Sequence, residues 1–121
     1  MFEISVEAQF SAAHRLRNYK GKCENMHGHN WRVKAIIAGG KLNSQGKIID
    51  FSELKNKLNE VIMRLDHKYL NDIDYFKKVN PTSENIAKYI YDKLCRGKAC
   101  LAPTLRISVW ETDTSCATYY E

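Results

Sequence analysis

Apolar and polar residues alternate along the first part of the chain. Every even position from 2 to 12 is apolar, whereas the odd positions between them are polar. This period of two predicts a half-buried β-strand over about residues 2–14. A second strand is predicted over residues 27–38, because the odd positions from Trp31 to Ile37 are apolar and Gly39 and Gly40 end the run.

Two later segments have the period of an α-helix. The first helix is expected to begin at Asp50, which fits a capping box with Glu53, and to end near Leu65, because apolar residues recur every three or four positions between them. The second helix is expected to begin at Thr82 or the serine after it, and to end where Gly97 lies between two basic residues.

The remaining segments complete the predicted fold. Residues 68–80 are expected to form a loop with a short turn, and residues 104–111 and 116–120 are expected to form two more strands. The resulting order is ββααββ. It predicts one α+β domain over residues 1–121, in which two helices cover one face of an antiparallel sheet.

Three of the four histidines are candidate metal ligands. His27 and His29 share the side of their predicted strand that carries the apolar residues, and His14 has the same parity at the end of the first strand. If the two strands pair antiparallel, the three imidazoles meet. Three histidines with an open fourth position are typical of a catalytic zinc site. The alternative is that the three rings only pack together or form hydrogen bonds.

Other candidate residues leave two interpretations open. Cys23 lies four residues before His27, so it could be a fourth metal ligand, or a nucleophile or base beside the metal. Asp66 next to His67 could fix the tautomer of the imidazole, or could cap a helix end. Glu111 has the parity of a covered strand face, which is costly for a carboxylate without a partner, unless a different register leaves it in solvent.

Composition narrows the class of protein. An apolar content of 44% and a charged content of 27% are typical of a soluble globular protein, and no apolar run is long enough to span a membrane. The chain has no recognisable export signal and its four cysteines form no CxxC pair, so we expect reduced thiols in the cytoplasm. The net charge of +5 suits nucleic acid, a phosphorylated small molecule or simple solubility.

Six short motifs occur in one order at compatible spacing, and with them nearly the whole chain resembles the 6-pyruvoyl-tetrahydropterin synthase family. The resemblance is greatest to its bacterial branch, the 6-carboxy-tetrahydropterin synthases of queuosine biosynthesis. The motifs are Phe10-Ser11-Ala12-Ala13-His14, Cys23-x3-His27-Gly28-His29-Asn30, Asp50-Phe51, Leu65-Asp66-His67-x2-Leu70-Asn71, Pro81-Thr82-Ser83-Glu84-Asn85 and Trp110-Glu111-Thr112.

The resemblance implies a fold, an assembly and a set of site residues. The fold is the tunnelling fold, in which sheets join at their edges into a barrel and trimers pair into a homohexamer, with active sites at the subunit interfaces. Bare sheet edges in a single chain make such an assembly physically reasonable. Carried over by position, the residues implied are His14, His27 and His29 for Zn²⁺, Cys23 with Asp66 and His67 for proton transfer, and Glu111 and Thr112 for the pterin.

The resemblance also implies a reaction. A zinc-dependent lyase of the carboxy branch converts 7,8-dihydroneopterin triphosphate into 6-carboxy-5,6,7,8-tetrahydropterin, acetaldehyde and triphosphate. The spacing of Cys23 before the His-Gly-His motif resembles this branch, although Glu24 stands beside the cysteine and a third branch uses glutamate there. The candidates for contacting the triphosphate are Arg15, Arg17, Lys20 and Lys22.

Two alternatives to this reaction remain. One is a pyruvoyl synthase, which eliminates triphosphate without cleaving the side chain. The other is a non-catalytic zinc module, in which Cys23 completes a closed metal site and the basic loop binds RNA. The lyase interpretation expects no nucleic-acid or membrane partner, and it accounts for Glu111, Asp66 and His67, which the zinc module leaves unexplained.

Overall fold

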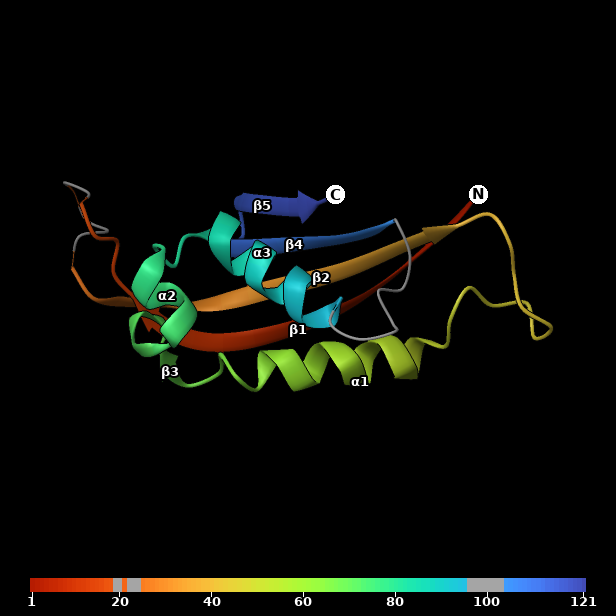
Figure 1. Ribbon diagram of the computed structural model, residues 1–121, viewed down its shortest axis with the longest axis horizontal. Helices are drawn as coiled ribbons and strands as arrows, with labels where there is room; N and C mark the ends of the chain where they lie inside the picture. The colour runs from red at the N-terminus through yellow and green to blue at the C-terminus, as the bar shows by residue number, and fades with distance from the viewer. Residues whose placement is uncertain (19–20, 22–24, 96–103) are drawn as a thin grey trace.

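The computed structural model describes residues 1–18, 21, 25–95 and 104–121, and Figure 1 shows their arrangement. The predicted strands and helices all form, and three short elements appear in addition. In chain order the elements are β1 (Phe2–His14), β2 (His27–Gly39), α1 (Phe51–Ile62), β3 (Lys68–Tyr69), the 3₁₀ turn η2 (Leu70–Asp72), α2 (Asp74–Lys78), α3 (Ser83–Leu94), β4 (Leu105–Thr112) and β5 (Ser115–Tyr120).

The described residues form a five-stranded sheet in the order β3-β1-β2-β4-β5. β1 and β2 pair antiparallel along their whole length, from Phe2 opposite Gly39 to His14 opposite His27. The prediction that the end of the first strand lies beside the start of the second is therefore confirmed. The sheet is not wholly antiparallel, because the unpredicted β3 runs parallel to β1 beside Ala12 and Ala13.

The alternation of the sequence corresponds to the two faces of the sheet. Val6, Phe10 and Ala12 of β1 are buried, as are the apolar residues of β2 at odd positions from Trp31 to Ile37. Phe2 departs from the pattern with an exposed fraction of 53%, because it lies at the outer end of the strand. The buried face ends at His14, which is only 1% exposed, so the apolar stripe leads directly to an imidazole.

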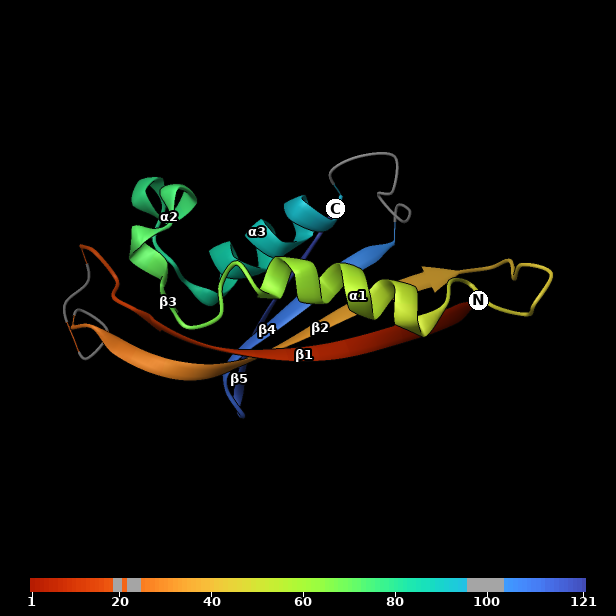
Figure 2. The same ribbon diagram turned by 90° about the horizontal axis from the view of Figure 1, so that it is seen from below.

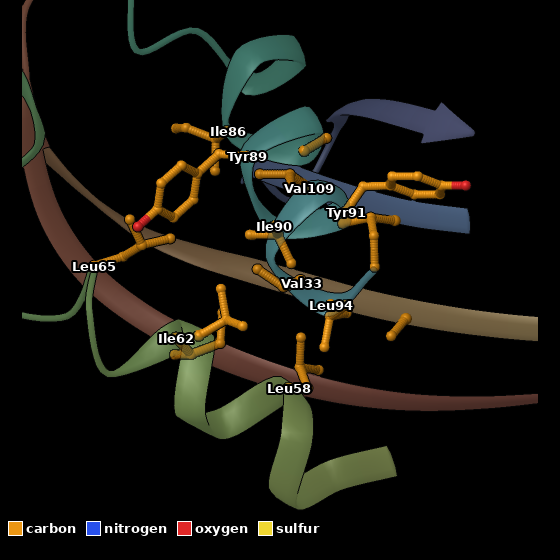
Figure 3. Packing of buried hydrophobic residues seen from close by; sticks show 14 of the residues in the cluster. Val33, Leu58, Ile62, Leu65, Ile86, Tyr89, Ile90, Tyr91, Leu94 and Val109 are labelled. Carbon is orange, nitrogen blue, oxygen red and sulfur yellow. The ribbon is translucent and has the colours of Figure 1, made fainter. Parts of the chain in front are cut away.

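The helices cover one face of the sheet, as predicted (Figure 2). α1 lies over β1, and α3 lies over β4 and β5. Between them, Leu58 of α1 and Ile90 of α3 belong to one apolar cluster with Val33 and Val109 of the strands (Figure 3). The opposite face carries polar pairs, such as Arg32 with Glu7. This arrangement leaves one face of the sheet without a covering layer among the described residues.

Both predicted helix starts are confirmed. Asp50 caps α1 by accepting a hydrogen bond from the backbone N–H of Ser52, and Thr82 caps α3 by accepting one from Asn85. The predicted reciprocal role of Glu53 does not form, because its carboxylate pairs with Lys57. The predicted end of α3 at residues 96–98 lies outside the described residues.

The end of the first helix differs from the prediction. α1 ends at Ile62 rather than near Leu65, because the next residues form a tighter turn in which the N–H of Leu65 bonds to the carbonyl of Ile62. The Leu65 side chain is nevertheless fully buried, so it contributes to the helical pattern of the sequence without belonging to the helix.

The prediction of a loop over residues 68–80 is wrong. This segment contains β3, η2 and α2, and it buries Leu70 and Phe76 completely. None of these elements is longer than five residues. A segment this short has no periodic apolar pattern that would distinguish it from a loop. The segment matters for the site because it leads into the turn before α3.

No helix within the described ranges is both long enough and apolar enough to cross a membrane.

Candidate metal centre

The three predicted ligand histidines come together at one end of the sheet. His14 and His27 are paired residues of β1 and β2, and their Nε2 atoms lie 2.9 Å apart. The ring of His29 is edge-on to both, with centroid distances of 5.3 Å to His14 and 4.7 Å to His27. Backbone pairing thus converts an His-x-His motif and a distant histidine into a compact cluster.

Backbone carbonyls fix the orientation of two of these rings. His14 Nδ1 lies 2.7 Å from the carbonyl oxygen of Pro81, and His27 Nδ1 lies 2.7 Å from that of Asn25. Because a carbonyl only accepts hydrogen bonds, each Nδ1 carries the proton and donates it. In the neutral rings each Nε2 then presents a lone pair to the other, a repulsive contact that a shared cation would relieve.

Burial favours the neutral form of two of the imidazoles, those of His14 and His29. Burial lowers the pKa of His14 below its usual value near 6.5, more than the hydrogen bond to Pro81 raises it. The pKa of His29 is likewise lowered by burial, and this outweighs the opposite effect of the Glu111 carboxylate. Neutral imidazole is the form that binds a metal, so the lowered pKa values favour metal over protons in the cluster.

Glu111 of β4 lies at the same point. One carboxylate oxygen, Oε1, is 2.7 Å from His29 Nε2, 3.7 Å from His14 Nε2 and 3.9 Å from His27 Nε2. Among the residues that the structure describes, none forms a hydrogen bond of acceptable geometry with the buried His29 Nε2, despite the short distance to Glu111. The prediction that Glu111 shares the covered face is confirmed, although its side chain is 27% exposed, and its partners there are the histidines.

The cluster has the dimensions of a divalent metal site. The ligand atoms of His14, His27, His29 and Glu111 all lie within 4.8 Å of one another. Tetrahedral zinc with Zn–N distances of about 2.1 Å requires ligand atoms about 3.4 Å apart. The separations above fall on both sides of that value, and the donor set of imidazoles with a carboxylate matches zinc chemistry. The residues therefore fit a metal ion.

The ring of Trp31 packs against two histidines of this cluster. It is fully buried, its indole N–H donates to the carbonyl of Ala12 at 3.3 Å, and its ring contacts the edges of His14 and His29 at centroid distances of 5.0 and 5.3 Å. A rigid apolar wall behind two ligands limits their rotation and excludes water from that side.

Asp66 and His67 form a contacting pair at the edge of β1. Their side chains lie 3.0 Å apart, although adjacent residues rarely face each other. His67 has a positive φ of 57°, which turns its side chain back toward Asp66. The pair is also fixed to the strand, because Asp66 accepts the N–H of Ser11 at 2.9 Å and the N–H of His67 donates to the Ser11 carbonyl at 2.6 Å.

The hydrogen bond from Ser11 is the main reason that the pKa of Asp66 lies below its usual value, with the neighbouring His67 adding to the effect. Asp66 is therefore an ionised carboxylate in neutral solution. The backbone N–H of Asp66 bonds to the carbonyl of Ile62 at the end of α1, whereas its carboxylate bonds to β1, so the side chain does more than cap a helix end.

A pocket of about 380 Å³ lies beside His67 and the start of β2. Its lining includes His29 and His67, and it also includes Ser11, Ala13, Gly28 and Asn30, which have the strand parity of the open face. The His67 side chain is 82% exposed, so its ring is accessible from this pocket. A small molecule in this pocket would lie on the open face of the sheet, next to His67 and the strand that carries His29.

The remaining predicted residues lie elsewhere or outside the described residues. Thr112 is the last residue of β4, exposed, with its hydroxyl 3.5 Å from that of Thr114. Cys23, Lys20 and Lys22 lie outside the described residues, so their predicted roles stay predictions. Cys116 lies on β5, far along the sheet order from β1.

Sequence reasoning missed two groups that orient the ligands. The carbonyl of Pro81 gives no signal in a sequence, because every residue has one. Trp31 has the same parity as His29, which identifies it as buried but not as a neighbour of two ligands. Both contacts depend on the tertiary packing of α3 and β2.

The comparisons with known proteins agree with this geometry. The sequence profile of the family described as 6-pyruvoyl tetrahydropterin synthase matches residues 3–121. The 6-carboxy-5,6,7,8-tetrahydropterin synthase of a Synechocystis species is 38% identical, covering 99% of this chain and 94% of the relative. The human 6-pyruvoyl tetrahydrobiopterin synthase is 36% identical, covering 97% of this chain and 90% of the relative.

The fold is also similar to solved structures. The structure of Caenorhabditis elegans 6-pyruvoyl tetrahydropterin synthase superposes with a TM-score of 0.89 at 31% identity, covering 99% of this chain and 95% of the other. The Plasmodium falciparum 6-pyruvoyl tetrahydropterin synthase superposes with a TM-score of 0.77 at 25% identity, covering 98% and 96%. The mixed α+β architecture is thus that of the tunnelling fold.

Proposed function

The chain belongs to the 6-pyruvoyl tetrahydropterin synthase family, a family of enzymes, and we propose that it is a zinc-dependent 6-carboxy-5,6,7,8-tetrahydropterin synthase of queuosine biosynthesis. Its substrate would be 7,8-dihydroneopterin triphosphate, and its products 6-carboxy-5,6,7,8-tetrahydropterin, acetaldehyde and triphosphate. The observation that carries the proposal is the cluster of His14, His27, His29 and Glu111, whose ligand atoms all lie within 4.8 Å of one another.

The three histidines would hold zinc, with their neutral Nε2 atoms as ligands. Zinc bound there would supply Lewis-acid polarisation of the side-chain oxygens of the substrate. The burial of His14 and the rigid ring of Trp31 support this assignment, because both preorganise the ligands. The metal fits all three interpretations of the sequence, so the remaining residues must decide among them.

Asp66 and His67 would move one proton of the reaction, and Cys23 would move another on the opposite side of the substrate side chain. The contact of Asp66 with His67 Nδ1 supports the first role, since it leaves Nε2 of an exposed ring to exchange protons with a ligand in the pocket. The role of Cys23 rests on its position in the family motif.

Glu111 would bind the pterin ring, accepting hydrogen bonds from its amino and NH groups, with Thr112 assisting. Support for this comes from the weak geometry of its present contact. Oε1 is close to His29 Nε2 without a satisfactory hydrogen bond, so the carboxylate has unused acceptor capacity. Arg15 and Arg17, which follow directly after β1, are candidates for contacting the triphosphate.

We also propose that copies of the chain assemble into a homohexamer, a dimer of trimers, in the cytoplasm. The open edges of the sheet support assembly: β5 is the last strand on one side, and on the other side β3 pairs with β1 only at Ala12 and Ala13. Unpaired edges of this length invite pairing with another chain. Joining the edge of β1 to the edge of β5 in a second copy would satisfy both.

The proposal must also choose between two activities of the family, the carboxy and the pyruvoyl reaction. Relatives named for the carboxy activity are 38% and 33% identical, and the human relative named for the pyruvoyl activity is 36% identical, so identity does not separate the branches. The short Cys-x3-His spacing favours the carboxy reaction. The alternative is a 6-pyruvoyl-tetrahydropterin synthase, which releases triphosphate but no acetaldehyde.

A product assay tests the proposal. Zinc-loaded protein is incubated with 7,8-dihydroneopterin triphosphate, and 6-carboxy-tetrahydropterin is measured by mass and acetaldehyde by a coupled reduction. We expect both products from the wild type and from the neighbouring control Glu24→Ala, and neither from Cys23→Ala. Triphosphate without acetaldehyde would move the protein to the pyruvoyl branch. If the protein binds its full complement of metal but does not turn over this substrate, the proposed enzyme activity is rejected and a closed, non-catalytic zinc module is favoured.

A further inference from the structure

The turn before α3 is part of the metal centre, although none of its side chains is a ligand. The carbonyl of Pro81 accepts the Nδ1 proton of His14 at 2.7 Å, and both residues are buried. This bond determines which nitrogen of His14 faces the other ligands. The position of the Pro81 carbonyl therefore sets the orientation of a ligand that lies 67 residues away in the sequence.

Asn85 closes this turn from the side of the helix. Its side-chain amide donates to the carbonyl of Asn80 at 2.9 Å, and the same carbonyl accepts the N–H of Thr82 at 2.8 Å. The hydroxyl of Thr82 in turn accepts the N–H of Asn85 at 3.2 Å. Pro81 has no N–H of its own, so these three bonds hold the residues on either side of it.

Asn80 ties the turn to the segment that leaves β1. Its side-chain oxygen accepts the N–H of Arg17 at 2.9 Å, and its side-chain amide donates to the carbonyl of Arg17 at 2.9 Å. The side chain thus imitates a strand pairing with a residue only three positions after His14. Asn71 makes the same two bonds to the main chain of Arg15, at 2.9 and 3.0 Å.

We propose that Asn80 and Asn85 are positioning residues of the metal centre, which hold the Pro81 carbonyl against His14 and so preorganise the ligand set. The inference rests on the proposed metal site and deepens it. Asn80 connects the turn to the segment that follows β1, and Asn85 connects it to α3, so the Pro81 carbonyl that orients the His14 ring is held from two sides. Groups that orient ligating histidines typically affect metal affinity by tenfold or more.

Asn85→Asp tests the inference without removing the helix. The substitution keeps the size of the side chain, and an acidic residue in the first helical turn is favourable for the helix dipole. It replaces the amide donor with a carboxylate that repels the Asn80 carbonyl. We expect the zinc dissociation constant, measured by chelator competition, to rise about tenfold, with a changed visible spectrum of the Co²⁺-substituted protein.

Three further variants make the measurement specific. Asn80→Ala removes both bonds to Arg17, and we expect a loss of zinc affinity at least as large as in Asn85→Asp. Asn71→Ala removes the corresponding clamp on Arg15 but leaves the Pro81 turn intact, so we expect a smaller loss. Asn59→Ala, an exposed position on α1, is the control for removing an asparagine and should bind zinc as the wild type does.

Each contrary outcome has a distinct meaning. Unchanged zinc affinity and an unchanged Co²⁺ spectrum in Asn85→Asp would overturn the inference. An equal loss in Asn71→Ala would assign the effect to the segment after His14 and overturn the role of the turn. A wild-type protein that binds no zinc would overturn the proposed metal site itself, and the inference with it, so the two failures are distinguishable.

Discussion

Glu111 can act on the metal or on the substrate, and one substitution separates these roles. Glu111→Gln keeps the size of the side chain but removes the charge that would accept hydrogen bonds from a pterin. If Glu111 binds the substrate, we expect zinc affinity to stay close to that of the wild type. A hydrogen bond to a charged group contributes about 1.5–3 kcal/mol. Its loss should therefore lower kcat/KM roughly ten- to a hundredfold.

His29→Ala is the matched comparison for that substitution. It removes a proposed ligand from the same cluster, so zinc affinity and activity should both be lost. Measuring the zinc content and the steady-state kinetics of both variants distinguishes the roles. A Glu111→Gln variant that loses zinc as His29→Ala does would identify the carboxylate as a fourth ligand and favour a closed metal site.

The ionised state of Asp66 predicts a dependence of stability on pH. Its pKa is lower in the folded chain than in the unfolded chain, where the ordinary value is near 3.8. The unfolded chain therefore binds the proton more readily, so the stabilisation is present above that pH and is lost as the pH falls through the folded pKa. We expect Asp66→Asn to be less stable than the wild type at pH 7.

Urea unfolding of both proteins between pH 7 and pH 2.5 measures this effect. The difference between their midpoints should narrow toward acid, because protonated Asp66 loses the charge that strengthens its bond to the Ser11 N–H. A difference that stays constant over the whole range would show that the charge of Asp66 contributes nothing to folding.

At the scale of single residues, the sequence predicts which side chains meet but not how they are held. The parity of His14, His27 and His29 follows from strand geometry, so their clustering was predictable. The contact between Asp66 and His67 was not, because it depends on a positive φ at His67 that a sequence of ordinary residues does not signal.

The elements between α1 and α3 supply a test of the corrected fold. Phe76 of α2 is fully buried against Tyr75 and Tyr89, with ring centroids 5.0 and 5.4 Å away. Phe76→Ala should reduce the free energy of unfolding by about 3–5 kcal/mol, as expected for deleting a buried aromatic ring. The exposed neighbour Lys78→Ala should change it by less than about 0.5 kcal/mol.

Denaturant unfolding of the two variants distinguishes a packed segment from a loop. If residues 68–80 were a loose loop, the two substitutions would have similar small effects. The long strands and helices could be predicted because each repeats its apolar pattern over several turns or alternations. The elements β3, η2 and α2 could not, because tertiary burial of Leu70 and Phe76 rather than local periodicity stabilises them.

At the scale of the whole molecule, the bare edges of β1 and β5 predict assembly. Light scattering should give a mass of six times the 14.0 kDa of the chain if the proposed hexamer forms. A monomeric mass at micromolar concentration would contradict the proposal and would require another explanation for the open edges. The sequence alone could not settle this, because edge strands have the same apolar pattern as internal strands.

Assembly also bears on catalysis, because His67 is 82% exposed in the single chain. An acid/base residue that acts in a water-excluded site needs a cover, and a second copy of the chain can provide one. If the proposed sites form between subunits, groups from different chains serve one reaction. We therefore expect two inactive variants, Cys23→Ala and His67→Ala, to regain activity when they are unfolded together and reassembled.

Activity is expected to return because mixed oligomers contain several combinations of the two variant chains. In a mixed oligomer, some interfaces join the intact Cys23 of one chain to the intact His67 of another, whereas oligomers of either variant alone contain no complete site. The measurement is acetaldehyde release by the mixture against each variant reassembled separately. Activity no greater than that of the separate variants, in mixed oligomers confirmed by mass spectrometry, would place both groups of one site on the same chain. The cover over His67 would then have to come from its own chain.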